Sequence, residues 1–118
     1  MTDLIACLSI GKGTWGHVAR VIEGMEWNKV ILITNKFAKD KFEVKKKFEM
    51  IMIDTNKTIS EMSEDIRKAL TGKINGLEVA LNIVSGDGRE HMAIISALLQ
   101  LGLGVRLVAL TKEGVRVI

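Results

Sequence analysis

The sequence has little of what several classes of protein require. It contains no proline or tyrosine, a single cysteine and only 4% aromatic residues. The lone Cys7 cannot form an internal disulfide, which favours a reducing compartment. So few aromatic side chains argue against a base-stacking surface for single-stranded nucleic acid. The two histidines and the cysteine lie far apart in sequence, so we expect no metal site and no other cofactor.

Nothing in the sequence predicts a membrane or secreted protein. No apolar run approaches the roughly 18 residues that a membrane-spanning helix needs. The N-terminus also lacks the basic segment of a signal peptide. We therefore expect a cytoplasmic protein with no membrane partner. The 118 residues, 47% hydrophobic and 26% charged, suffice for one domain over residues 1–118 with a single core.

Positive charge is concentrated in one segment. Residues 36–47 hold six lysines and two carboxylates, which gives a local charge of +4. Since the net charge of the whole chain is +3, the remaining residues carry a net charge of −1. We interpret this segment as the solvated face of a helix, because charge runs are usually exposed to solvent. A nucleic-acid-associated interaction protein is the alternative, although no recognised binding motif accompanies the lysines.

Apolar runs alternate with segments that carry helix signals. Near-continuous apolar runs are typical of strands buried on both faces of a parallel sheet. A four-residue turn with a late glycine separates the last two runs and predicts a hairpin. Gly24 and Gly72 are expected to end the helices before them. The predicted strands are residues 4–10, 29–34, 48–54, 77–84, 105–110 and 115–118. The first predicted helix ends near residue 23, and three more cover residues 36–47, 59–70 and 88–100.

Helix starts are marked by capping residues. In a capping box, an N-cap side chain and a carboxylate three residues later each bond the other's backbone amide. Thr58 and Glu61 match this pattern, and Asp87 and Glu90 have the same spacing. Asn35 is the candidate N-cap of the lysine-rich helix.

The order βαβαβαβαββ predicts an α/β fold with helices on both faces of a mostly parallel sheet. We expect a Rossmann-like, doubly wound sheet of order 3-2-1-4-5 with an antiparallel C-terminal hairpin strand. The winding then reverses between strands 1 and 4, and ligands of such sheets bind at that point, beyond the carboxyl ends of the strands. The loops that follow these two strands, residues 11–16 and 85–89, are both glycine-rich.

The first loop matches the pattern GxGxxG, between a strand and a helix, through Gly11, Gly13 and Gly16. This is the setting of a dinucleotide fingerprint, in which a helix N-terminus binds phosphate. A conventional NAD(P)-type regulatory domain is therefore one hypothesis. Against it, strand 2 ends at Thr34-Asn35 where an acidic residue would hold the ribose hydroxyls. A tight turn that needs glycine for backbone reasons alone is the other interpretation.

Several side chains could add chemistry at this point of the sheet. Lys12 and Arg89 would bring positive charge for an anionic, phosphate-bearing ligand. Thr14 and Ser85 would add hydroxyl donors, although Thr14 and Asp87 also suit simple N-caps.

Three further side chains have a structural alternative. Asn82 lies within strand 4 and could be a buried amide bonded to backbone. His17 and His91 fall in first helical turns, where each could be a general acid or base or a packing residue.

The predicted helix 88–100 is apolar on nearly all sides. Such a helix is covered on both faces. In a domain of this size we expect a second copy of the chain to supply the outer cover, in a two-fold homodimer that brings two ligand sites together.

Residues 81–92, LNIVSGDGREHM, together with the LIACLSIGKGTWG of strand 1 and its loop, resemble the CRISPR-associated Rossmann-fold (CARF) domain. Ser85, Gly86 and Gly88 match the family's strand-4 turn, Arg89 its basic position and Met92 its methionine. The element order matches over essentially the whole chain. The strict GxGxxG, and Glu90 where a second basic residue is often found, depart from the family pattern.

The resemblance implies a homodimer that binds a cyclic oligoadenylate second messenger across its two-fold axis. Because the chain ends at Ile118, directly after the hairpin, we expect a stand-alone domain that serves a separate effector protein, sequesters the ligand or cleaves it as a metal-independent ring nuclease. Positioning and charge stabilisation would carry such cleavage. The candidates for cleavage are Lys12, Ser85, Arg89, His17 and His91. The candidates for ligand binding are Ser9, Gly11, Lys12, Gly13, Thr14, Trp15, Asn82, Ser85, Gly86, Asp87, Gly88 and Arg89.

Overall fold

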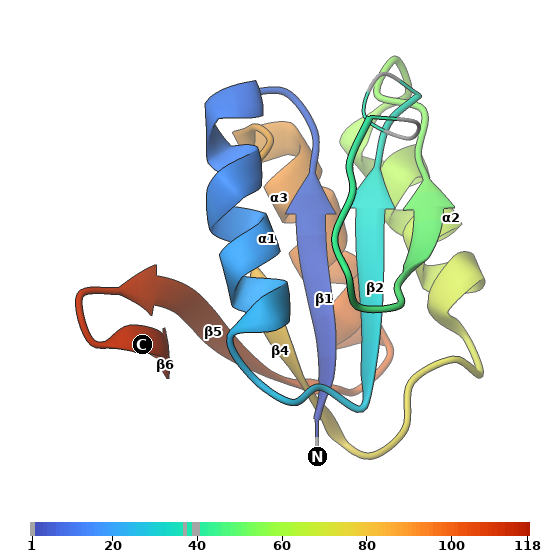
Figure 1. Cartoon of the computed structure of the whole chain (residues 1–118). Coiled ribbons are helices and arrows are strands. Elements are labelled where there is room, and N and C mark those ends of the chain that lie inside the picture. The colour runs from blue at the N-terminus through green and yellow to red at the C-terminus, as the bar shows by residue number, and fades with distance from the viewer. Residues whose placement is uncertain (1, 37, 39–40) are drawn as a thin grey trace.

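A computed structural model describes residues 2–36, 38 and 41–118, with the side chain of Lys12 outside the description. Figure 1 shows a central sheet with helices on both sides. The strands are β1 (Asp3–Leu8), β2 (Lys29–Thr34), β3 (Glu49–Met52), β4 (Glu78–Asn82), β5 (Gly104–Thr111) and β6 (Gly114–Val117). The helices are α1 (Trp15–Glu23), preceded by a 3-10 turn (Lys12–Thr14), α2 (Ile59–Leu70) and α3 (Gly88–Gln100).

The sheet has the order β3-β2-β1-β4-β5-β6, which confirms the predicted α/β fold. β1 pairs in parallel with both β2 and β4, and β6 pairs antiparallel with β5. The chain therefore winds away from β1 in both directions, as in a Rossmann-like domain.

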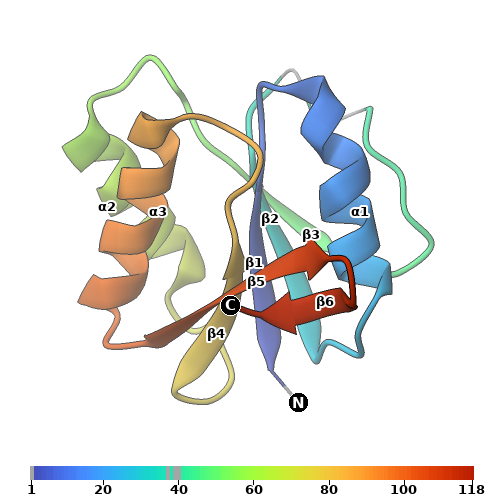
Figure 2. The same ribbon diagram turned by 90° about the vertical axis from the view of Figure 1, so that its left-hand side faces the viewer.

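Two hydrophobic clusters cover the two faces of the sheet. β1 contributes to both, because its successive side chains point to opposite faces. Leu4 and Leu8 belong to the cluster under α1, whereas Ile5 and Cys7 belong to the cluster under α2 and α3. Figure 2 shows α1 on one side of the sheet and the α2–α3 pair on the other. The β5–β6 hairpin forms one edge of the sheet.

Both predicted capping boxes are confirmed. The Thr58 hydroxyl accepts from the backbone N–H of Glu61 at 3.2 Å, and the Glu61 carboxylate accepts from the N–H of Thr58 at 3.0 Å. The Asp87 and Glu90 pair makes the same two bonds at 3.0 Å each. These bonds satisfy amides that the first turn of a helix leaves unpaired.

The predicted helix over residues 36–47 is wrong for the part that the structure describes. Residues 41–47 form no helix, and residues 37, 39 and 40 lie outside the described residues. The Asn35 side chain does accept from the N–H of Ala38 at 2.9 Å, as an N-cap would, but residues 41–47 do not continue as a helix.

Tertiary packing explains why this segment is not helical. Phe42 meets Trp15 edge-on, with 6.3 Å between ring centroids, and Phe48 edge-on at 5.9 Å. Phe42, Val44 and Phe48 thereby pack against the same core as α1. Lys41, Lys45 and Lys47 are exposed, so the segment buries its apolar side chains while these lysines face solvent, and aromatic burial overrides the helical preference of lysine.

The strands predicted at 4–10, 48–54 and 77–84 are shorter in the structure. At the end of β1 the cause is a polar side chain: the N–H of Ser9 donates to the Ser85 hydroxyl instead of to a neighbouring strand. No helix among the described residues is long and apolar enough to cross a membrane.

Candidate functional site

The loops after β1 and β4 lie side by side, as the predicted strand order requires. The Ser85 hydroxyl is fully buried and accepts a hydrogen bond from the N–H of Ser9 at 3.0 Å. The N–H of Gly86 donates to the carbonyl of Ile10 at 3.1 Å. These two bonds join segments 76 residues apart into one surface, here called the paired loops (residues 9–16 and 84–89).

Helices α1 and α3 both begin at the paired loops, at the end of the sheet where β1 and β4 finish (Figure 1). A side-chain carbon added at Gly13, Gly16 or Gly88 would meet no other atom within 4 Å. The backbone is therefore open to a ligand at three positions beside two helix N-termini. The positive ends of two helix dipoles favour an anion there, while the carboxylates of Asp87 and Glu90 already accept from two of the amides at the start of α3.

The polar groups of the first loop are largely used within the protein. The indole N–H of Trp15, a buried side chain, donates to the carbonyl of Ser9 at 2.9 Å. The Thr14 hydroxyl donates to the carbonyl of Gly11 at 2.6 Å, so Thr14 occupies the N-cap position of α1 without capping it through its side chain. Gly11 has φ of +88°, a conformation that glycine adopts without strain.

Asn35 stands where a dinucleotide-binding domain would carry its ribose-binding acid. Its amide donates to the hydroxyl of the buried Ser9 at 2.8 Å, while its oxygen accepts from Ala38. The Asn35 side chain thus links the end of β2 to the first loop by hydrogen bonding.

His17 and Asn82 form a contact beneath α1. The Asn82 amide nitrogen donates to the carbonyl of Val108 at 2.9 Å and lies 3.2 Å from His17 Nε2. The backbone N–H of Leu110 donates to the same Nε2 at 3.3 Å. Because both partners are donors, Nε2 accepts and the ring proton is on Nδ1. Burial lowers the pKa of His17 from its ordinary value, since the charged ring would be poorly hydrated there.

His91 and Cys7 lie under the second loop. The imidazole Nε2 of His91 donates to the carbonyl of Ser85 at 2.7 Å, because a carbonyl only accepts. Burial raises the pKa of the Cys7 thiol far above its usual range, and the carboxyl groups of Glu90 and Asp87 raise it further. Cys7 is buried, and its raised pKa keeps it in the unreactive thiol form at neutral pH.

Arg89 is bound to a different loop. Its two terminal nitrogens donate to the carbonyls of Thr55 at 3.0 Å and Lys57 at 2.6 Å, in the connection between β3 and α2. The guanidinium ties α3 to this connection while keeping its positive charge near the start of α3. The side chain of Lys12, the other predicted cation, lies outside the described residues.

A hollow at the carboxyl ends of β2 and β3 was not expected from the sequence. It lies beside the paired loops, since Asn35 contributes to its wall and also bonds Ser9. Asp54 and Thr55 line it from the connection that follows β3. Parallel strands end at one edge of a sheet, and that rule was the signal that could have pointed to these residues.

Among the described residues, no group of three or more histidine, cysteine or acidic side chains converges as metal ligands would. The geometry defines a Rossmann-like α/β domain compatible with nucleotide binding. Comparison with protein-family models gave no match, and neither did comparison with curated proteins.

Proposed function

We propose that this chain is a nucleotide-binding module that holds an anionic ligand at the paired loops, and that the ligand is a cyclic oligoadenylate. The observation that carries the proposal is the direct bonding of the two loops, Ser9 to Ser85 and Ile10 to Gly86, at the point where the sheet reverses its winding. Ligands of doubly wound sheets bind at that point.

Recognition would come chiefly from the backbone. Gly13 and Gly88 leave room for a phosphate to approach the chain, and the N-termini of α1 and α3 supply the favourable dipoles. The choice of a cyclic oligoadenylate rests on the resemblance of residues 81–92 to the CARF domain.

We assign binding rather than cleavage to the site. Four of the five candidate side chains for cleavage are already bonded to protein groups: Ser85 to Ser9, Arg89 to Thr55 and Lys57, His17 to Asn82 and Leu110, and His91 to Ser85. A side chain held in this way is poorly placed to move a proton on a ligand.

The proposal includes a two-fold dimer. The outer side of α3 carries Met92 and Leu99, which are 63% and 62% exposed and lie on one helical stripe. Ile10 and Val84, the apolar residues just before the two glycine-rich turns, are also exposed. A second copy packed over this surface would bury these side chains and place two sets of paired loops next to each other.

The test is calorimetric titration of cyclic tetra-adenylate into the wild type and into Gly13→Leu. The new side chain enters open space, so the melting temperature is expected to hold while affinity falls about tenfold or more. Gln100→Leu, exposed at the far end of α3, is the matched control and is expected to bind as the wild type does. Equal binding by Gly13→Leu, or no binding by the wild type, would overturn the assignment.

Chromatography of the same mixtures, without added metal, separates the alternatives. We expect intact ligand retained by the protein. Linear products would instead establish a ring nuclease, and failure to retain cyclic tetra-adenylate together with retention of NAD(P) would establish the conventional dinucleotide domain. Sedimentation of the wild type is expected to show a dimer that Met92→Glu dissociates, because a charge at that position would be buried without a partner.

A further inference from the structure

We propose that a groove at the opposite end of the sheet binds single-stranded nucleic acid. This groove, here called the lysine groove, is formed by residues 26–30 from the α1–β2 connection and residues 46–49 from the segment that enters β3. Its volume is about 730 Å³, within the range of sites that hold small organic groups. It lies at the amino ends of β2 and β3, away from the paired loops.

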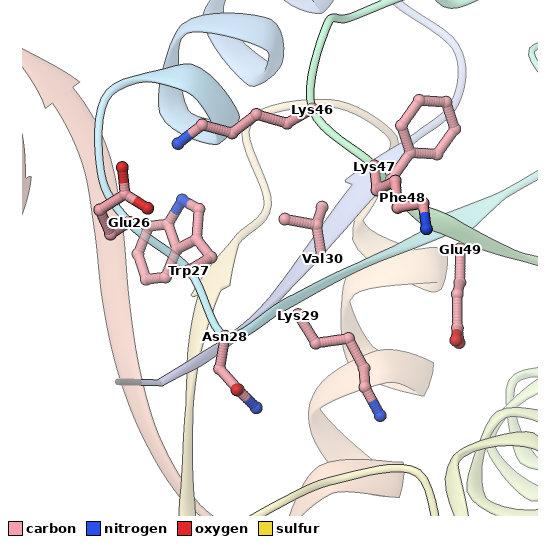
Figure 3. A pocket seen from close by; sticks show the side chains of 9 residues that line it. All are labelled: Glu26, Trp27, Asn28, Lys29, Val30, Lys46, Lys47, Phe48 and Glu49. Atoms are coloured by element: carbon pink, nitrogen blue, oxygen red, sulfur yellow. The ribbon is translucent and has the colours of Figure 1, made fainter.

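Two aromatic side chains line the lysine groove. Figure 3 shows Trp27 and Phe48 on opposite sides of Val30, each from a different connection. The indole N–H of Trp27 donates to the carbonyl of Val21 at 3.0 Å, which fixes the ring against α1. Phe48 is held edge-on against Phe42. The rings are thus positioned before any ligand arrives, which lowers the entropic cost of stacking a base on them.

The composition argued against such a surface, because aromatic residues are few. Even so, two of the five aromatic residues, Trp27 and Phe48, line the same groove, because the pairing of β2 with β3 brings the segments before these two strands together.

Positive charge surrounds these rings. The ammonium of Lys46 donates to the carbonyl of Met25 at 2.6 Å, and that of Lys29 donates to the carbonyl of Lys73 at 2.6 Å. Both partners are neutral carbonyls and form no ion pair with the lysines. The exposed Lys47 makes no hydrogen bond or ion pair with another described residue.

Two carboxylates also line the lysine groove. Glu49 lies 3.7 Å from the ammonium of Lys73, a contact that offsets its charge. No described contact offsets the negative charge of the Glu26 carboxylate. With Lys29, Lys46 and Lys47 against Glu26 and Glu49, the lining carries a net +1.

This combination suits a polynucleotide better than other anions. A base offers a flat face to Trp27 or Phe48, and its phosphates meet the lysines. Lys45, directly before Lys46 in the sequence, is also exposed and adds a fourth lysine to this part of the chain. An acidic peptide would match the lysines through its carboxylates, but it offers the rings a flat face only where it carries an aromatic side chain, whereas every nucleotide carries a base.

The test uses fluorescence anisotropy of a labelled oligothymidylate 12-mer with the full chain. Lys47→Glu reverses an exposed, unbonded charge and is expected to weaken binding about fivefold or more at low salt. The matched control is Lys112→Glu, an equally exposed lysine in the β5–β6 turn, which is expected to stay within about twofold. Equal effects of the two variants would show that the oligonucleotide is attracted only by the overall positive charge of the protein. That result would overturn the proposed binding site in the lysine groove.

Stacking is tested separately with Trp27→Leu, whose folding is checked by thermal melting. Loss of a stacked base is expected to weaken oligothymidylate binding about fivefold or more. A folded Trp27→Leu protein with unchanged affinity would overturn the proposal. So would thymidine monophosphate that binds as tightly as the 12-mer, which indicates a free nucleotide site, or polyglutamate that competes equally well, which indicates an acidic protein partner.

The lysine groove is independent of the proposed function. Gly13→Leu is expected to retain oligothymidylate binding, and Lys47→Glu is expected to retain binding of cyclic tetra-adenylate. Loss of oligothymidylate binding in Gly13→Leu would place both ligands at the paired loops and would overturn the separate groove.

Discussion

Replacement of Ser85 by alanine tests whether the paired loops are one structural unit. The Ser85 hydroxyl is fully buried and is the acceptor for the N–H of Ser9, another buried residue. Alanine leaves that N–H without its partner in a place that water does not reach. An unsatisfied buried donor costs about 1–3 kcal/mol. Against a total of roughly 5–15 kcal/mol for a domain, this is a large fraction of the stability.

Urea unfolding followed by circular dichroism measures the effect. We expect Ser85→Ala to shift the midpoint with an unchanged slope, because the same surface is exposed on unfolding. The melting temperature should fall by about 3–6 °C for each kcal/mol lost. Ser60→Ala, on the exposed side of α2, is the control and should change stability by less than about 0.5 kcal/mol. Equal stability of the two variants would refute the idea that Ser85 joins the loops.

Three further substitutions are predicted from the contacts around the paired loops. Gly86→Ala should destabilise the fold by about 2 kcal/mol or more in urea unfolding, because φ is +95° and the new carbon would lie 2.7 Å from Cys7 Sγ. Asp87→Ala removes an N-cap and should cost about 1 kcal/mol by the same assay. Unfolding measured from pH 7.5 to pH 5 should show a smaller loss of stability in His17→Gln than in the wild type. The pKa of His17 is lowered in the folded state, so its contribution is complete above pH 6.5 and is lost as the pH falls below that value.

Local signals in the sequence predicted most of the fold. The capping boxes at Thr58 and Asp87 depend only on residues within one turn, so they could be identified without knowledge of the rest of the molecule. The alternation of strands and helices then predicted a doubly wound sheet through general rules of connection, and 3-2-1-4-5 is one of the common orders of such sheets. The adjacency of the paired loops follows from that order alone.

Contacts between distant residues could not be predicted in this way. The lysine-rich segment resembles a helix by composition, but Phe42 packs against Trp15 and Phe48, and residues 41–47 are not helical. Ser85 bonds a residue 76 positions away, and Arg89 one 34 positions away. No pattern in the sequence distinguishes a serine or arginine that binds a ligand from one that joins two loops.

The most direct test of the central claim is a titration of the ¹⁵N-labelled protein with cyclic tetra-adenylate, followed through backbone amide shifts. We expect the largest changes on the paired loops and the first turns of α1 and α3, with Gly13, Gly16 and Gly88 among them. Changes confined to Trp27, Lys47 and their neighbours in the lysine groove, or no changes at all, would contradict it.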